Sequence, residues 1–245
     1  MEIFSDYDLG SKLNFHYQNA KPFPNIIIDN FINPGVAMQC FKELKQTNYW
    51  MTESSQNAYM TDNQVNKWFT PWDEQSVEQL RYEVPTVSNV LTYFNSPIFL
   101  QFLKDLTGIP DLIPDPIMWG GGCHKIENGG RLNLHVDYNI SPKSKKFRVL
   151  NMLLYLNPNW EDEWRGHLEL WNKKEKKREH IIAPIMNRAV IFTLSDDSVH
   201  GHPAPLNCPE GFERYSIAMY YFVDEPNQEY YERTYVHWHN ELQSH

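Results

Sequence analysis

The 245-residue sequence contains few cysteines, and few basic residues for its acidic content. Its three cysteines, Cys40, Cys123 and Cys208, are scattered and form no C-x-x-C pair, which argues against a disulfide framework and a zinc ribbon. The 22 Lys and Arg residues are outnumbered by 31 Asp and Glu residues, which gives a formal charge of -9. This balance disfavours non-specific binding to nucleic acid or to anionic membranes.

Long apolar runs are also absent. The longest are only as long as a strand, and the N-terminus carries Glu2, Asp6 and Asp8 where a secretory signal would need an apolar core. We therefore expect a cytoplasmic protein that binds neither membranes nor nucleic acid. A length of 245 residues fits one domain, residues 1–245, with enough chain to bury a core.

The first 115 residues or so predict a support of helices and loops. After a short strand over residues 22–29, a helix is expected to begin with Asn33 as its N-cap. Two further helices are predicted over residues 85–94 and 96–106 from apolar residues at three- and four-residue spacing. Residues 46–75 contain almost no aliphatic side chains but several aromatic ones, which favours ordered loops that lie over another surface.

Short strands with turn residues between them dominate from residue 116 onwards, a pattern typical of a β-sandwich or barrel. The expected strands are residues 117–126, 132–138, 147–156, 166–171, 180–183, 188–194 and 213–223. Together with the helices, they predict a mainly β protein with flanking helices (α+β).

One of these strands carries a candidate metal-binding pair. From Arg131 to Asp137 apolar and polar residues alternate, so His135 and Asp137 point to the same face of the strand. An imidazole and a carboxylate so placed can bind one metal ion. The pair alone is weak, because roughly one such H-x-[DE] match is expected by chance, and the sequence also contains His167-Leu-Glu169 and His239-Asn-Glu241.

Later segments offer partners for this pair. Ser198-Val-His200-Gly-His202 can supply a third ligand, from either histidine, and Arg214-Tyr-Ser216 begins an apolar strand soon afterwards. Two histidines and one carboxylate on one face of an iron ion leave three positions open, which suits O2 chemistry with a chelating cosubstrate. A downstream arginine can bind the far carboxylate of such a cosubstrate.

In this order, His135-x-Asp137, His200 and Arg214-x-Ser216 resemble the Fe(II)- and 2-oxoglutarate-dependent dioxygenases. Further motifs between about residues 117 and 223 resemble the prolyl-4-hydroxylase-like branch: Gly129-Gly130, residues 151–160, residues 166–171, residues 184–188 and residues 200–203. The resemblance implies a double-stranded β-helix, a jelly-roll, cupin-like barrel over about residues 116–224, followed by a tail over residues 225–245.

The resemblance places iron on His135, Asp137 and His200. It is the family's His-Gly pattern that favours His200 over His202 as the second histidine ligand. Arg214 is expected to pair with the distal carboxylate of 2-oxoglutarate, assisted by Ser216 and by Tyr155. Asn151 and Leu153 are predicted to share the strand face of Tyr155, whereas the directions of Lys125, Asn133 and Arg148 stay open.

The activity implied by the resemblance is hydroxylation of an unactivated C–H bond by O2, with conversion of 2-oxoglutarate to succinate and CO2 and with ascorbate as a further candidate reductant. Because Asp137 fills the position that halogenating relatives leave open for chloride, hydroxylation is favoured over halogenation. The expected substrate is a prolyl peptide or a small amino-acid-like molecule. The alternatives are a non-catalytic cupin-like metal-binding module and an oxygenase that acts on modified nucleic acid.

Three further segments have open roles. Lys143, Lys145, Lys146 and Arg148 follow the first ligands, and a second basic cluster occupies residues 173–178 in an expected hairpin. Both are interpreted as solvated turns, although the first can instead attract an anionic substrate. The aromatic C-terminus, from Tyr230 to His239, is either a helix that closes the barrel mouth or a docked tail.

Overall fold

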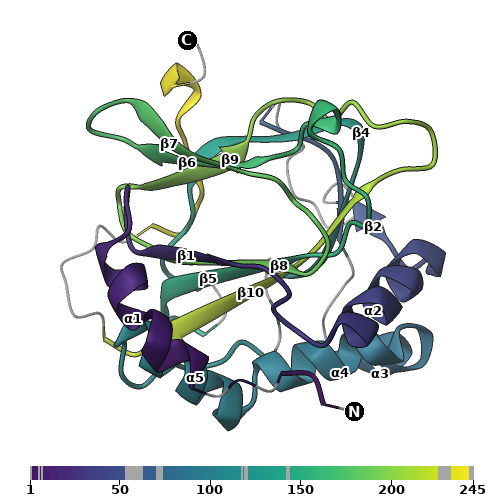
Figure 1. Cartoon of the computed structure of the whole chain (residues 1–245), viewed down its shortest axis with the longest axis horizontal. Coiled ribbons are helices and arrows are strands. Elements are labelled where there is room, and N and C mark those ends of the chain that lie inside the picture. Colours follow the sequence, from purple (N-terminus) through teal and green to yellow (C-terminus); the bar gives the residue numbers. More distant parts are fainter. Residues whose placement is uncertain are drawn as a thin grey trace.

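The computed structural model describes residues 2–4, 6, 8–52, 63–69, 74–116, 118, 121–141, 144–225 and 233–242. In this part of the chain, two layers of antiparallel strands enclose a barrel and the helices lie beneath one layer (Figure 1). The strands are β1 (Asn25–Ile28), β2 (Met51–Thr52), β3 (Gln64–Phe69), β4 (Gly122–Val136), β5 (Phe147–Tyr155), β6 (Leu168–Asn172), β7 (Lys177–Ile182), β8 (Arg188–Thr193), β9 (Ser198–His202), β10 (Arg214–Val223) and β11 (His237–Trp238).

The main path through the sheet runs β1-β8-β5-β10-β4-β9-β6-β7. Strands β1, β8, β5 and β10 form the layer above the helices, and β9, β6 and β7 form the opposite layer (Figure 1). The sheet therefore uses β1 and β3, which precede residue 116, as well as the strands predicted after it. All strands expected beyond residue 140 are present within a few residues of the predicted bounds, and β9 is an additional strand.

Strand β4 connects the two layers. Its first part, up to Ile126, pairs with β10, and its second part, from Leu132, pairs with β9. Between them the chain bends at Gly129, which has φ +76°, and at Gly130, where a Cβ would lie 2.7 Å from the Glu127 carbonyl oxygen. The prediction of two separate strands here was wrong, because the two glycines bend one continuous strand instead of ending it.

The strands beside the helices are apolar on both faces because both faces are buried. In β5, Met152 and Leu154 face the helices and join the large core cluster, whereas Tyr155 belongs to the cluster inside the barrel. Leu153 packs against that inner cluster, and with Asn151 and Tyr155 it lines the barrel cavity, as the strand period predicts. Although β5 is apolar along most of its length, alternate residues of this strand face the barrel cavity.

The helices are α1 (Leu9–Asn19), α2 (Pro34–Gln46), α3 (Glu74–Glu83), α4 (Pro85–Phe94) and α5 (Pro97–Thr107). Helix α2 begins as predicted, since the Asn33 side chain accepts hydrogen bonds from Gly35 and Val36. Ser96 caps α5, and Gly108 ends it at φ +69°. The predicted helices are therefore confirmed, and α1 and α3 are two helices that the sequence did not predict. Every helix in the described residues is too short or too polar to cross a lipid bilayer.

Residues 46–75 were predicted as loops, and this was wrong for the two stretches that form β2 and β3. Strand β3 pairs with β4 along most of its length and therefore extends the barrel wall. Within this segment, residues 53–62 and 70–73 lie outside the described residues.

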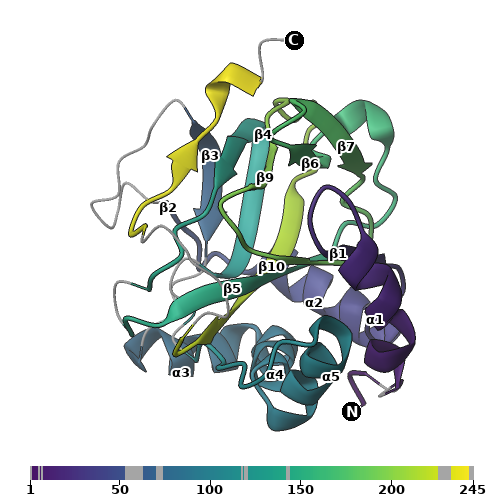
Figure 2. The ribbon, with the colours of Figure 1, turned by 90° about the vertical axis from the view of Figure 1, so that its left-hand side faces the viewer.

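The C-terminal segment was predicted as a helix or a docked tail, and the described part, residues 233–242, contains a strand. Strand β11 pairs with β4 and is followed by a short 3-10 helix, Asn240–Leu242. Figure 2 shows this segment beside β4 and β3. Tyr230 and Tyr231 lie outside the described residues.

Candidate active site

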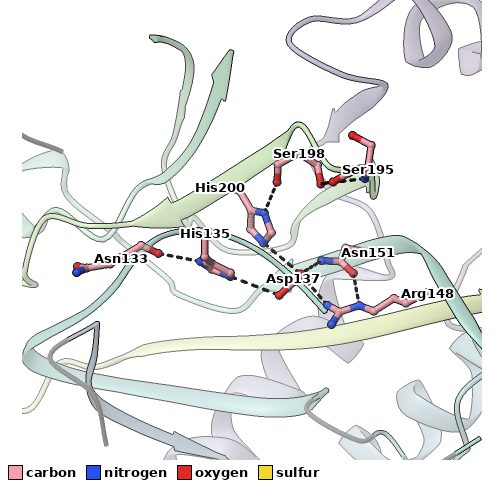
Figure 3. Close-up of polar contacts among 8 residues, drawn as sticks. All are labelled: Asn133, His135, Asp137, Arg148, Asn151, Ser195, Ser198 and His200. Carbon is pink, nitrogen blue, oxygen red and sulfur yellow. Dashed lines mark hydrogen bonds and ion pairs between the residues drawn. The ribbon is translucent and has the colours of Figure 1, made fainter. Parts of the chain in front are cut away.

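His135, Asp137 and His200 form a buried cluster at the junction of β4 and β9. His135 and His200 are register partners on these strands, and Asp137 follows the last residue of β4. One ligand atom from each residue lies within 4.8 Å of the other two, so the three can hold one metal ion. Asp137 Oδ1 is 3.4 Å from His135 Nε2, and its Oδ2 is 3.4 Å from His200 Nε2. Figure 3 shows the two rings and the carboxylate converging.

Backbone carbonyl groups orient both imidazoles. His135 Nδ1 is 2.8 Å from the Asn133 carbonyl oxygen, and His200 Nδ1 is 2.9 Å from the Ser198 carbonyl oxygen (Figure 3). A carbonyl can only accept, so each Nδ1 carries the proton and each Nε2 presents a lone pair to the centre of the cluster. Burial, and then the neighbouring His200, lower the pKa of His135, which favours the neutral ring that metal binding requires.

Asp137 is held by two donors on its far side. Arg148 Nη2 donates to Oδ2 at 2.9 Å, and Asn151 Nδ2 donates to the same atom at 2.7 Å (Figure 3). Burial alone would raise the pKa of Asp137, but Arg148 and the two histidines outweigh it and hold the pKa well below its usual value. The carboxylate is therefore ionised and fixed in position.

A second polar cluster surrounds Arg214 at the start of β10. Arg214 Nε donates to the Gly166 carbonyl oxygen at 2.9 Å, and Nη2 lies 3.2 Å from the Tyr155 hydroxyl. Ser216 is the register partner of Tyr155, so its side chain belongs to the same region. Arg214 is only 4% exposed, and within the described residues it has no carboxylate partner. Burial lowers its pKa, as expected for a cation without a countercharge.

One cavity of about 240 Å³ joins the two clusters. Its wall includes all six residues for which the sequence predicted roles in metal or cosubstrate binding, together with His202, Arg148 and Trp238. The arrangement thus places in one space a metal-binding set and a buried cation that has no carboxylate partner in the described part of the chain. Such a cavity can bind a metal ion at one end and an anionic group at the other.

Residues 121–222 match the family model of the 2OG-Fe(II) oxygenase superfamily. This segment, which contains His135, Asp137, His200 and Arg214, is similar to that superfamily. No curated protein sequence is significantly similar to it.

Several solved structures share the fold of this chain. A prolyl hydroxylase from Trichoplax adhaerens, in complex with a hypoxia inducible factor oxygen degradation domain peptide fragment, has a TM-score of 0.55 at 20% identity, over 88% of this chain and 90% of that chain. A Pseudomonas putida prolyl-4-hydroxylase has a TM-score of 0.50 at 15% identity, over 87% of this chain and 98% of that chain. HygX from Streptomyces hygroscopicus, with nickel and 2-oxoglutarate bound, has a TM-score of 0.53 at 10% identity, over 92% of this chain and 96% of that chain. The expected double-stranded β-helix with flanking helices is confirmed.

The residues of the site fit the groups that the name of the matching family implies. Two imidazoles and one carboxylate match an iron site with three open positions. The buried guanidinium of Arg214, with no carboxylate partner among the described residues, fits the free end of a dicarboxylic 2-oxo acid. His202 is not a member of the metal-binding group.

The other H-x-[DE] matches have structural partners. Glu169 accepts hydrogen bonds from Trp171 at 2.7 Å and from Arg178 at 2.9 Å, and His239 is 2.7 Å from Glu241. Neither match belongs to a metal-binding group among the described residues. The basic residues 173–178 form the expected β6–β7 hairpin, in which several side chains make ion pairs.

Arg148 is the main residue whose role the sequence did not reveal. The sequence left its direction open and also grouped it with basic residues interpreted as solvated turns. The solvated position is wrong for Arg148, which lines the cavity and is buried against Asp137. A β-bulge in β5 opposite Tyr221 and Phe222 shifts the register, so that Arg148 turns into the cavity on the same side as Asn151. Nothing in the residue pattern marks this bulge. Lys125 pairs with Glu127 and Asn133 binds Asn63, and neither is part of the cavity wall.

Trp238 was also not predicted as a site residue. Its pairing with His135 across β11 and β4 brings the two ring centres to 5.3 Å. The only signal in the sequence was the aromatic C-terminus, and aromatic content does not tell which strand a segment pairs with.

Proposed function

We propose that this chain is a 2-oxoglutarate-dependent hydroxylase in which His135, Asp137 and His200 hold Fe(II). Arg214, Ser216 and Tyr155 then bind the distal carboxylate of 2-oxoglutarate. The observation that carries the proposal is the buried Arg214 in the same cavity as the His-Asp-His group. A buried cation is costly unless an anion pairs with it, and the described residues provide no such anion.

Iron and 2-oxoglutarate, when bound, supply the oxidising power that inserts an oxygen atom from O2 into a C–H bond, with release of succinate and CO2. The chain's own residues orient these groups. The carbonyl oxygens of Asn133 and Ser198 fix the two imidazoles, and Arg148 and Asn151 fix Asp137. The Tyr155 hydroxyl accepts from Arg214, so its own proton is available to a carboxylate.

The substrate we propose is a prolyl peptide or a small amino-acid-like molecule. Support comes from the solved structures of similar fold, two of which are prolyl hydroxylases and one of which contains a peptide. The cavity wall near the metal group contains the aromatic residues Tyr138, Tyr220 and Trp238, which suit an apolar ring such as that of proline.

The first test is anaerobic addition of Fe(II) and 2-oxoglutarate, followed by visible spectroscopy. Both chelating atoms of the 2-oxo acid need adjacent open positions on the metal, so wild type should develop a weak charge-transfer band. Asp137→Ala should abolish it, and a band of full intensity in this variant would refute the ligand assignment. His200→Ala should lose iron while His202→Ala keeps most of it; the opposite pattern would make His202 the ligand.

The second test measures succinate release and product mass with prolyl peptides, free amino acids and modified oligonucleotides. The expected result is uptake of one oxygen atom by a peptide or an amino acid, with label from 18O2. A chlorinated product in the presence of chloride, or turnover with oligonucleotides alone, would contradict the proposed reaction or substrate class.

A further inference from the structure

His202 is a cavity residue to which no role has been assigned. It lies at the end of β9, is only 4% exposed and forms part of the cavity wall. Its Nδ1 is buried and has no hydrogen-bond partner among the described residues. In this respect it differs from His135 and His200, whose Nδ1 atoms contact backbone carbonyl oxygens.

The missing partner indicates which nitrogen carries the proton. His202 is almost fully buried, and no carboxylate pairs with it among the described residues, so the neutral ring with one N–H group is the less costly form. A proton on Nδ1 would be a buried donor without an acceptor, which is more costly than a buried lone pair. The N–H group therefore belongs on Nε2, and His202 is a hydrogen-bond donor without an assigned acceptor.

The bend of β4 places this donor and Arg214 on the wall of one cavity. His202 pairs with Leu132 on the second part of β4, and Arg214 pairs with Ile126 on the first part. Strand β3 pairs with both parts of β4, and only one residue separates its partners of Arg131 and Ile126, so the bend brings the two parts close together. Both side chains line the same cavity.

We propose that His202 donates from Nε2 to the distal carboxylate of 2-oxoglutarate, beside Arg214. This inference rests on the proposed function of the cavity. A carboxylate offers about four acceptor sites. Arg214 donates from Nε to the Gly166 carbonyl oxygen and directs Nη2 to the Tyr155 hydroxyl, so only some of its N–H groups can reach the ligand. Acceptor sites on the ligand's carboxylate are therefore left for a further donor. A neutral donor adds a directed hydrogen bond without adding another buried charge to the site.

The experiment compares two ligands in four proteins. The ligands are 2-oxoglutarate and 2-oxopentanoate, which has a methyl group in place of the distal carboxylate. The proteins are wild type, the non-donor variants His202→Leu and His202→Met, and His202→Gln, which keeps an N–H donor. Each is loaded with Fe(II) without oxygen, and the charge-transfer band is titrated with each ligand. Iron content and thermal unfolding show whether each variant is folded and loaded.

A hydrogen bond to a charged carboxylate predicts that the non-donor variants bind 2-oxoglutarate roughly tenfold to a hundredfold more weakly than wild type. Their affinity for 2-oxopentanoate should be unchanged, and His202→Gln should recover most of the loss for 2-oxoglutarate. Either non-donor variant that loads iron like wild type is sufficient for the comparison.

Three results would overturn the proposal. Equal losses for the two ligands would place the His202 contact away from the distal carboxylate. Wild-type affinity for 2-oxoglutarate in the non-donor variants would show that His202 makes no contact with it, while leaving the proposed function intact. Failure of wild type to bind 2-oxoglutarate would overturn this inference together with the proposed function.

Discussion

Arg148 and Asp137 form a buried ion pair in which Nη2 of the arginine lies 2.9 Å from Oδ2 of the aspartate. The guanidinium carbon lies 3.2 Å from the ring centre of Tyr220, and Nε donates to Asn151 at 2.9 Å. Asn151 donates to the same Oδ2. Oδ2 is thus occupied by two donors, and Oδ1 is the oxygen that is free of them. The protein positions this carboxylate before any metal binds.

Asn151→Ala should weaken iron binding by about tenfold to a hundredfold, because it removes a neutral donor that orients Asp137. The measurement is competitive titration of Fe(II) under anaerobic conditions. Asn157→Ala is a matched control, since Asn157 is also buried but donates to the carbonyl oxygens of Pro184 and Tyr215. The control should lose stability and keep its iron affinity. Equal iron affinity in Asn151→Ala and wild type would mean that Asn151 does not position the ligand.

Arg148→Met should lower the free energy of unfolding of the metal-free protein by about 3 to 5 kcal/mol, because it leaves the Asp137 carboxylate buried without a full countercharge. A bound divalent cation supplies a countercharge, so Mn(II) should stabilise this variant more than wild type. Urea denaturation of both proteins with and without Mn(II) gives the four values needed. The same Mn(II) effect in both proteins would contradict the pairing argument.

Arg214→Lys should weaken 2-oxoglutarate binding by roughly tenfold to a hundredfold, since the bidentate, charge-assisted bond is worth about 1.5 to 3 kcal/mol. Iron affinity should hardly change, because Arg214 contacts Gly166 and Tyr155 and none of the metal group. Arg214→Ala should bind 2-oxoglutarate more weakly still. The arginine would be structural if both variants bound 2-oxoglutarate like wild type when measured separately from iron.

Stability should fall as the pH drops below the ordinary histidine pKa of 6.5, because His202 is neutral in the folded protein and takes up a proton on unfolding. The folded pKa is the lower one, so the unfolded state binds more protons in this range and acid favours it. His202→Leu removes this proton uptake. The change of the free energy of unfolding with pH should then be smaller by up to about 1.4 kcal/mol per pH unit. Urea denaturation of wild type and His202→Leu at about pH 7.5 and about pH 5.5, without metal, measures this pH dependence. The same pH dependence in both proteins would contradict the neutral state assigned to His202 in the folded protein.

Gly201→Ala should disturb iron binding although glycine has no side chain to contribute. A Cβ at this position would lie 2.7 Å from the Asn133 carbonyl oxygen and 2.9 Å from that of Leu132, so β9 would have to move away from β4. His200 would move with it, and iron affinity should fall by at least about tenfold. Gly35→Ala, on the exposed first turn of α2, should leave iron binding unchanged. Unchanged iron binding in Gly201→Ala would show that β9 can move away from β4 without disturbing the position of His200.

The sequence predicted the strands beyond residue 140 because their apolar runs are bounded by turn residues. It did not predict β9, whose residues Ser198, His200 and His202 are polar and yet buried; the two histidines line the cavity, and Ser198 contacts His200 through its carbonyl oxygen. Helix α1 was missed because only two of its residues, Gly10 and Tyr17, are buried, so it has almost no apolar stripe. The single-domain organisation predicted for residues 1–245 stays a prediction.

At the site, the strand period placed His135 and Asp137 on one face, and the resemblance to the Fe(II)- and 2-oxoglutarate-dependent dioxygenases implied which other side chains meet them. His135, Asp137 and His200 converge, and Tyr155 and Ser216 lie beside Arg214. The supporting residues could not be predicted in the same way. Arg148 depends on a bulge, and Trp238 depends on the pairing partner of β11, and both are properties of the assembled sheet.

If Arg214 binds a dicarboxylic 2-oxo acid as proposed, its charge, which has no carboxylate partner among the described residues, links the stability of the protein to the supply of that small metabolite. A dicarboxylic ligand that binds only the folded state adds about 2.7 kcal/mol to the free energy of unfolding at a hundred times its dissociation constant. The fraction of molecules open to proteases would then fall by about a hundredfold. The buried arginine that prepares the cavity for its ligand would thus also make the lifetime of the protein in a cell depend on how much of that ligand the cell contains.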